Sequence, residues 1–307
     1  MEIDKLCQMK TLLRELFHFI LHLRLHYQFL LLSGGYLLGG LMAGTMNESQ
    51  FWIQFLNVHV LLFGGATAYN SYWDKDEGPI GGLKNPPKMT GWMHIASLLM
   101  MYAGWIWAWQ VGMVYFLVYG VSLIFFWLYS TPFFRWKGKP HLSLVAIAFS
   151  TGFNSVLLGS LAAGGAIDSV LILAAAGASF VLLSLYPVSQ VYQSDEDGKR
   201  GDVTFTAHYG LAMVKRFFLV TFFGGLVLFS SAMSFLYPIP ATALVIVGTL
   251  SGLVIRQNIV SLTGNESEYD RVMKVKFIAS LSFVLFLLAS NAIRYEWIQT
   301  EVLKKLF

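Results

Sequence analysis

Charged residues are scarce in this sequence: they make up 12% of 307 residues, whereas hydrophobic residues make up 56%. A soluble globular domain has about twice that share of charge. Too few ionisable groups therefore remain to cover the surface of a water-soluble enzyme of this size. The composition also excludes a disordered chain, a coiled coil and a fibrous protein. The lipid bilayer is the solvent that this composition fits.

Cysteine is almost absent, with Cys7 as its one occurrence. A single thiol excludes a disulfide framework and a metal site built from cysteines. The sequence also contains no phosphate-binding loop, nucleophile elbow or nucleic-acid-binding pattern. Nucleic acid is therefore not an expected partner.

What the sequence does contain is long apolar runs, and a spanning helix needs roughly 20 such residues. We predict an all-α, polytopic membrane protein, a bundle of about nine transmembrane helices that forms one domain over residues 1–307. The predicted spans are approximately Leu25–Ala43, Trp52–Tyr72, Gly91–Trp109, Val111–Ser130, Leu142–Ala163, Ile167–Tyr192, Phe217–Leu236, Ile239–Ile255 and Phe277–Ile293. Gly35-x-x-x-Gly39 on the first span is expected to let helices approach closely.

Lysine and arginine gather on one side of this predicted bundle. If nine spans alternate, all but three of the 21 Lys and Arg residues lie in the N-terminal segment and in the loops after the even-numbered spans. The three exceptions are Arg294, Lys304 and Lys305. The positive-inside rule then places the N-terminus and these loops in the cytoplasm.

Two acidic clusters follow directly on the second and sixth predicted spans, at the basic side of the bundle. Ionisable groups at a membrane boundary are costly and indicate a functional site. The first cluster is Asp74, Asp76 and Glu77, and the second is Asp195, Glu196, Asp197 and Asp202.

The two clusters resemble each other in sequence. One reads Tyr69-Asn70-Ser71-x-x-Asp74, and the other reads Tyr192-Gln193-Ser194-x-x-Asp197. In each, an amide residue precedes an aspartate by four positions, which places both on one helical face. We therefore predict two pseudo-repeated halves that present these edges to a central cavity.

Carboxylate and amide oxygens are ligands that suit Mg²⁺, which also binds substrate phosphate oxygens. Basic residues flank both clusters, and we expect Lys84, Lys199 and Arg200 to bind a diphosphate together with the metal. The bundle beneath is rich in aromatic residues, at 16% of the chain. A diphosphate site above an apolar cavity fits an isoprenyl diphosphate. Aromatic faces such as Tyr72, Trp73 and Tyr129 are candidates for lining the prenyl cavity and stabilising a developing carbocation.

These residues resemble the UbiA superfamily of intramembrane prenyltransferases, which are nine-helix bundles with two aspartate-rich motifs and Mg²⁺. In the first motif, N-D-x-x-D-x-x-x-D, Asn70 and Asp74 match, whereas Ser71 and Gly78 replace acids. In the second, D-x-x-x-D-x-x-x-G-x-x-T, Gln193 departs from the pattern and three residues match it. The matching residues are Asp197, Gly201 and Thr204. The turn Tyr129-Ser130-Thr131-Pro132, followed by Arg135, Trp136 and Lys137, also resembles the family's loop after its fourth helix.

The resemblance implies a Mg²⁺-dependent enzyme, with Mn²⁺ as a substitute, that transfers a prenyl group from an isoprenyl diphosphate to a lipophilic acceptor. It implies catalytic roles for Asn70, Asp74 and Asp197. The implied metal ligands are Asn70, Asp74, Asp76, Gln193 and Asp197, where either Asp76 or Glu77 takes over from a missing acid.

Two alternatives stay open at this point. A terpene cyclase of the same superfamily would use the same ionising site without an acceptor. A transporter of small anions or metal ions is disfavoured, because transport sites usually lie near the bilayer midplane, whereas these acids lie at one face.

Overall fold

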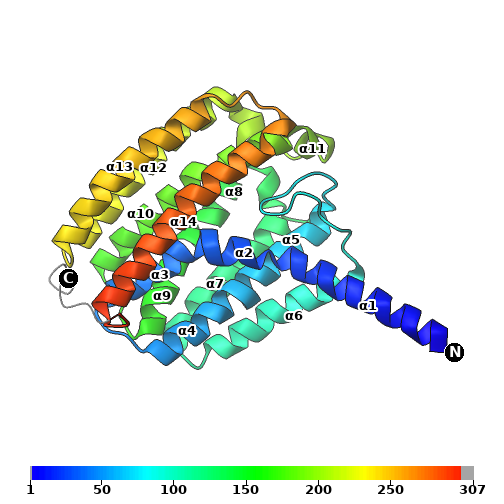
Figure 1. Cartoon of the computed structure of the whole chain (residues 1–307), viewed down its shortest axis with the longest axis horizontal. Coiled ribbons are helices and arrows are strands. Elements are labelled where there is room, and N and C mark those ends of the chain that lie inside the picture. Colours follow the sequence, from blue (N-terminus) through cyan, green and yellow to red (C-terminus); the bar gives the residue numbers. More distant parts are fainter. Residues whose placement is uncertain (1, 299–307) are drawn as a thin grey trace.

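The computed structural model describes residues 2–298, and this part of the chain consists of helices and loops with one isolated bridge between Ile80 and Leu83. Lys304 and Lys305, expected on the side opposite the other basic residues, lie outside the described residues. Figure 1 shows the helices in a bundle from which α1 extends outward. In chain order the principal helices are α1 (Glu2–Leu23), α2 (Leu25–Tyr27), α3 (Ser33–Met42), α4 (Glu48–Leu56), α5 (Gly65–Asp74), α6 (Gly91–Ala108), α7 (Met113–Ser130), α8 (Pro140–Ile147), α9 (Asn154–Ala163), α10 (Ser169–Leu185), α11 (Ser194–Lys199), α12 (Phe205–Ser234), α13 (Pro238–Val260) and α14 (Tyr269–Arg294).

Short irregular helices join several of these into longer stretches. Three are π-helical, namely η1 (Gln28–Leu32), η2 (Asn57–Gly64) and η4 (Ala148–Phe153), and three are 3₁₀ helices, namely η3 (Trp136–Gly138), η5 (Pro187–Gln193) and η6 (Glu266–Glu268). Within residues 2–298, seven helical stretches are long and apolar enough to cross a membrane. The predicted spans 25–43 and 91–109 are also helical, as α2–η1–α3 and α6. The prediction of an all-α membrane bundle is therefore confirmed, with about nine as an approximate count.

The arrangement brings the two acidic motifs to the same end of the bundle. α10, α12, α13 and α14 contact one another in sequence along one side, and α5, α6 and α7 do so on the other. α11 and the loop after α5 lie together at one end in Figure 1. The ends of the second and sixth predicted spans are thus neighbours in space.

The two motifs differ in local structure. Asn70 and Asp74 lie on the continuous helix α5, where the Asn70 amide donates to Asp74 Oδ2 at 2.6 Å. The second motif was predicted on one continuous helix, and this prediction is wrong. Pro187 has no N–H for helical hydrogen bonding, so α10 ends at Leu185 and is followed by η5. Gln193, with φ −105° and ψ 0°, is the last residue of η5 and the N-cap of α11.

Glycines hold two helix pairs at close range, as expected for small residues in membrane helices. A Cβ on Gly39 of α3 would overlap the Val156 carbonyl of α9, and one on Gly159 would overlap the Tyr36 carbonyl. At the contact of α10 with α12, a Cβ on Gly177 would lie 2.5 Å from the Phe229 nitrogen. These backbone contacts fix the helices that surround the cavity.

We expect Gly39→Ala to lower the thermal unfolding temperature of the purified protein in detergent. Its methyl group meets backbone atoms that cannot rotate away, and overpacking of this kind costs about 1–3 kcal/mol. The matched control is Gly224→Ala on α12, whose Cβ would have nothing within 4 Å. Equal unfolding temperatures for the two variants would contradict the close α3–α9 contact.

Candidate functional site

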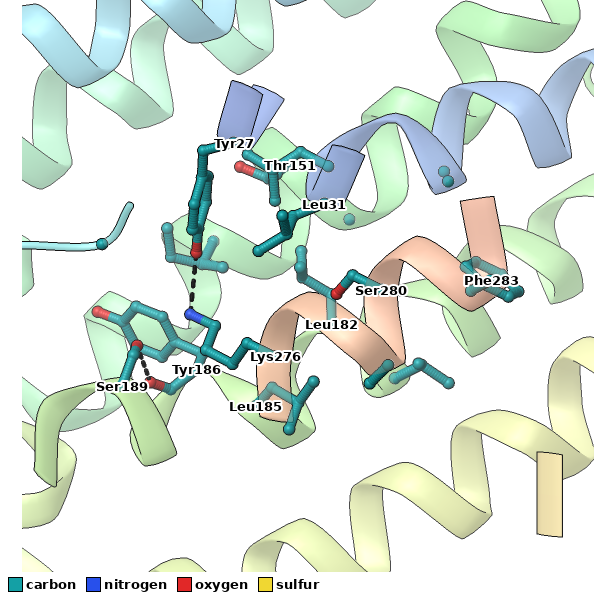
Figure 2. Close-up of a pocket in the computed structure, with 18 of the residues that line it drawn as sticks. Tyr27, Leu31, Thr151, Leu182, Leu185, Tyr186, Ser189, Lys276, Ser280 and Phe283 are labelled. Carbon is teal, nitrogen blue, oxygen red and sulfur yellow. Dashed lines mark hydrogen bonds between the residues drawn. The ribbon is translucent and has the colours of Figure 1, made fainter. Parts of the chain in front are cut away.

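A cavity of about 780 Å³ lies inside the bundle. Its walls are mostly apolar and include Phe126, Leu185, Phe229 and Phe283. Figure 2 shows part of this lining, contributed by helices from distant parts of the chain. The polar end of the cavity is formed by the ends of α5 and α11 and by the loops beside them. The cavity is therefore an apolar chamber with ionisable groups lining one end.

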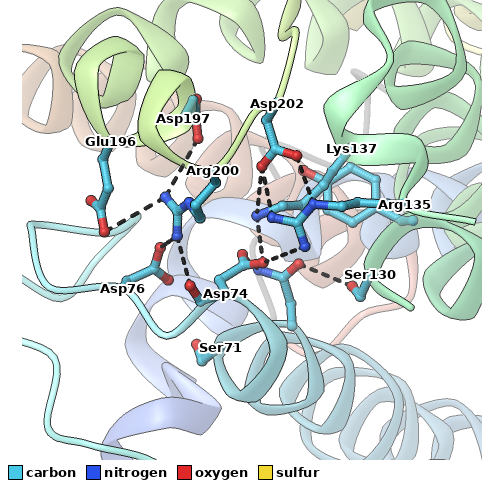
Figure 3. A network of polar contacts seen from close by, with 12 residues as sticks. Ser71, Asp74, Asp76, Ser130, Arg135, Lys137, Glu196, Asp197, Arg200 and Asp202 are labelled. Atoms are coloured by element: carbon cyan, nitrogen blue, oxygen red, sulfur yellow. Dashed lines mark hydrogen bonds and ion pairs between the residues drawn. The ribbon is translucent and has the colours of Figure 1, made fainter. Parts of the chain in front are cut away.

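Four aspartates line this polar end, and they are buried. Asp74 and Asp197 are each 6% exposed and Asp202 is 5% exposed. The side chain of Asp76 is 5% exposed. Carboxylates at this depth need compensating charge, and Figure 3 shows that basic side chains surround them.

The loop between α7 and α8 supplies two of these basic side chains. Lys137 Nζ lies 2.5 Å from Asp74 Oδ1 and 3.8 Å from Asp202 Oδ2. Arg135 donates through Nε and Nη2 to the two oxygens of Asp202, at 2.6 and 2.8 Å. Arg135 has the left-handed backbone conformation, with φ 42°, which is uncommon outside glycine. The bidentate pair of Arg135 with Asp202 connects this loop to the second acidic motif.

Arg200, at the end of α11, connects the two motifs. Its guanidinium donates to Asp76 Oδ1 at 2.7 Å and to the Asp74 carbonyl at 2.9 Å, and it lies 3.5 Å from Asp197 Oδ1. Burial alone would lower the pKa of Arg200, but the hydrogen bond and charge of Asp76, with the charges of Asp74 and Glu196, raise it overall. Arg200 therefore stays cationic and bridges carboxylates from both halves of the chain.

The structure brings most of the predicted site residues into this cavity. The aromatic candidate Tyr129 lines it, with its hydroxyl 2.9 Å from that of Tyr186. Asp195 is exposed, although it lies two positions from the buried Asp197. The lining includes every residue proposed as a metal ligand, namely Asn70, Asp74, Asp76, Gln193 and Asp197.

Other predicted residues lie elsewhere. Lys84 pairs with Asp270 at 2.6 Å on the surface, with side chains 60% and 71% exposed. Lys199 is exposed and, with Trp73, lines an outer groove that also includes Asp74 and Arg200. Tyr72 stacks on His94 with a centroid distance of 4.3 Å and does not line the cavity. Of the three predicted diphosphate-binding cations, Arg200 lines the cavity, whereas Lys84 lies away from it. The roles expected for Lys199 and Trp73 stay predictions.

Sequence reasoning assigned no role to four ionisable residues that line the cavity. Lys137 belongs to the loop after the fourth predicted span, and Asp202 to the second acidic cluster. Arg24 belongs to the N-terminal segment and Lys276 to the loop after the eighth predicted span, yet both line the cavity and are only 9% and 7% exposed. Periodicity cannot detect such residues, because their direction depends on packing between helices distant in sequence.

The oxygen donors at the polar end fit Mg²⁺ in chemical type. Among the described residues, however, no group of three His, Cys, Asp or Glu side chains is arranged to hold a metal ion. Mg²⁺ commonly uses one or two carboxylates and completes its shell with water and substrate phosphate oxygens. The residues present therefore fit a metal that binds together with a phosphate-containing substrate.

The fold is similar to several solved structures. A UbiA homologue from Archaeoglobus fulgidus bound to DMAPP and Mg²⁺ has a TM-score of 0.70 and 14% identity, over 89% of this chain and 99% of that one. The same homologue bound to GPP and Mg²⁺ has a TM-score of 0.68 and 16% identity, over 90% and 99%. A digeranylgeranylglyceryl phosphate synthase structure has a TM-score of 0.58 and 15% identity, over 91% and 99%.

A model of the UbiA prenyltransferase family matches residues 32–288. The chain belongs to this family. No curated protein matches its sequence significantly. This UbiA family member is an integral, multi-pass membrane protein, as its long apolar helices require.

The pairing of Arg135 with Asp202 can be tested by a double-mutant cycle on thermal stability. Arg135→Gln should destabilise the protein by on the order of 3 kcal/mol, because it removes the bidentate partner of a buried carboxylate. The double variant Arg135→Gln/Asp202→Asn should recover part of this loss, since no buried charge is then left unmatched. Arg216→Gln, at an exposed arginine, is the control and should have little effect. Strictly additive effects of the two single changes would argue against the pairing.

Proposed function

We propose that this protein is a Mg²⁺-dependent intramembrane prenyltransferase that moves a prenyl group from an isoprenyl diphosphate to a lipophilic acceptor. The observation that carries the proposal is the placement of buried carboxylates and the cations Lys137 and Arg200 at the polar end of an apolar cavity. Membership of the UbiA family and similarity to homologues bound to DMAPP or GPP with Mg²⁺ support it.

In this proposal the diphosphate lies at the polar end and the prenyl chain extends into the apolar chamber. Asn70, Asp74, Asp76, Gln193 and Asp197 are the candidate ligands for Mg²⁺, and Mn²⁺ would fit the same oxygen donors. When bound, the metal neutralises negative charge on the diphosphate. Lys137 and Arg200 are placed to donate charge-assisted hydrogen bonds to its oxygens.

The reaction begins with heterolysis of the bond between C1 of the allylic chain and the diphosphate oxygen. The electron pair leaves with the diphosphate, where Lys137 and Arg200 stabilise the growing charge. The acceptor nucleophile supplies the pair for the new bond to C1 and loses a proton. The apolar walls exclude water that would otherwise capture the allylic cation, and the ring of Tyr129 can stabilise that cation.

The proposal also includes the orientation of the protein in the membrane. The predicted concentration of Lys and Arg at the end that carries both acidic motifs favours a cytoplasmic location for that end and for the N-terminus. The diphosphate would then enter from the cytoplasm, where water-soluble isoprenyl diphosphates occur, and the acceptor from the bilayer. In this proposal the whole chain acts as one domain.

We expect diphosphate release to require a divalent metal. Purified protein would be incubated with geranyl diphosphate, with and without candidate acceptors, in Mg²⁺, in Mn²⁺ and in excess EDTA. Activity should disappear in EDTA and return when Mg²⁺ is added, because the carboxylates would otherwise repel the diphosphate. Full turnover in EDTA would exclude the proposed site. Release of diphosphate without an acceptor, with a cyclic hydrocarbon product, would instead identify a terpene cyclase.

Asp74→Asn and Asp197→Asn should each lower the single-turnover rate by at least 100-fold, the scale expected on loss of about 3 kcal/mol of transition-state stabilisation. Asp195→Asn is the matched control, because Asp195 is in the same motif but exposed. It should keep most of the activity. An inactive Asp195→Asn variant alongside an active Asp197→Asn variant would show that the second motif acts through its other face.

A further inference from the structure

The loop between α5 and α6, residues 75–90, lies beside α11 at the end of the bundle that carries both acidic motifs (Figure 1). Asp76 near its start, and Ile80 and Gly81 further along, line the cavity. Ile80 is only 2% exposed, and its N–H and carbonyl exchange hydrogen bonds of 2.9 Å with those of Leu83, which closes a tight turn. The middle of the loop therefore faces the cavity and covers part of its polar end.

Within the described residues, five carbonyl oxygens of this loop accept hydrogen bonds from side chains of other segments. Three of these bonds are 3.2 Å or longer and come from η5, from α14 and from Arg24. The two shortest come from histidines. His22 Nε2 lies 2.7 Å from the Pro87 carbonyl oxygen, and His26 Nε2 lies 2.8 Å from the Gly82 carbonyl oxygen. Because a carbonyl oxygen can only accept a hydrogen bond, both imidazoles carry a proton on Nε2.

The helix that carries His22 is itself fixed beside the far end of the loop. Trp92, on the first turn of α6, donates through Nε1 to Glu15 Oε2 at 2.7 Å. Phe19 packs on the same indole with a centroid distance of 5.5 Å. The second half of α1 is therefore anchored to α6, and it can hold the end of the loop in place through His22.

The turn of the loop approaches the second histidine closely. Gly82 has φ +83°, and a Cβ at this position would lie 2.9 Å from the Tyr27 ring and 3.1 Å from His26 Nε2. Glycine satisfies both constraints, because it adopts positive φ without strain and has no Cβ. Both histidines precede residue 32, where the match to the family begins. The contact is thus a feature of this chain's own N-terminal segment.

We propose that His22 and His26 are positioning residues, which hold residues 79–88 over the polar end of the cavity and so keep water away from the allylic cation. This inference rests on the proposed function, because a closed loop matters to the chemistry only if an intermediate forms that water can capture. Loops that close over a site commonly serve reactions of this kind. Neither histidine is part of the cavity lining, so both act through the loop and not on the substrate.

The first measurement is amide hydrogen exchange of the full-length protein in detergent, without substrate. His22→Ala and His26→Ala should each speed exchange in residues 79–88 by roughly two- to tenfold, the scale expected for loss of one hydrogen bond. His22→Gln and His26→Gln should recover most of the protection, because glutamine retains an N–H donor of similar reach. His18→Ala is the matched control. His18 lies one turn before His22 on α1, and among the described residues it makes no hydrogen bond to the loop.

The second measurement is the rate at which geranyl diphosphate with Mg²⁺, in the absence of an acceptor, gives a prenyl alcohol. In this reaction the diphosphate leaves with the electron pair of the C1–O bond, and water adds to the allylic cation and loses a proton. The double variant His22→Ala/His26→Ala should form the alcohol about threefold faster than wild type or more, because the loosened loop admits water. A general structural defect would lower this rate instead. His18→Ala should match the wild type.

Unchanged exchange in residues 79–88 of both alanine variants would overturn the inference. Faster exchange spread over the whole bundle, with a lower unfolding temperature, would also overturn it, because the histidines would then have a general structural role. The same conclusion would follow if the double variant showed faster loop exchange without faster alcohol formation. Failure of the wild type to release diphosphate from geranyl diphosphate would reject the proposed function, while the exchange measurement would still test whether the histidines hold the loop.

Discussion

The burial of several carboxylates at the end of an apolar bundle is the constraint on which the rest of the site depends. An isolated carboxylate in a medium of low dielectric would take up a proton or unfold the region around it. Asp74 and Asp202 remain compensated because Lys137 and Arg135 come from the loop after α7, and Asp76 because Arg200 comes from the end of α11. The charges therefore connect three segments that share no secondary structure. The geometry of the site follows from this mutual neutralisation more than from any single helix.

Interruptions in the helices bring these charged residues together at the polar end of the cavity. α10 ends at Leu185, before Pro187, and the following 3₁₀ helix and α11 carry Asp197 and Arg200 to the polar end of the cavity. Left-handed residues at Arg24, Lys75 and Arg135 turn the chain where continuous helices would direct it outward. Elsewhere the glycine contacts hold α3 close to α9 and α10 close to α12. The polar end of the cavity is thus formed by irregular backbone, and closely packed helices support it.

The sequence was sufficient to predict the helical bundle, the shared end of both motifs and the inward direction of Asp74. These features depend on apolar run length and on the i, i+4 geometry of one helix, which are local properties. The apolar run before the second motif extends past Pro187 and predicts a continuous helix, whereas α10 ends at Leu185 and a 3₁₀ helix follows. Lys84 was assigned to the diphosphate by its proximity in sequence, whereas its partner Asp270 is far along the chain. Lys137 and Lys276 depend on contacts between distant helices, which no local pattern contains.

The acid–base pairs at the polar end have a consequence for ligand binding in the proposed enzyme. Binding of a diphosphate alone would draw Lys137 and Arg200 away from Asp74, Asp76 and Asp197 and leave buried carboxylates without compensation. Binding of a metal alone would draw the carboxylates away from their cations. If both were bound, Lys137 and Arg200 could contact phosphate oxygens while the carboxylates held the metal, so that no buried charge would be left unmatched. Such an exchange makes the two ligands reciprocally cooperative. In that case the described residues would need no preformed cage for the metal, because the substrate would supply the remaining ligands.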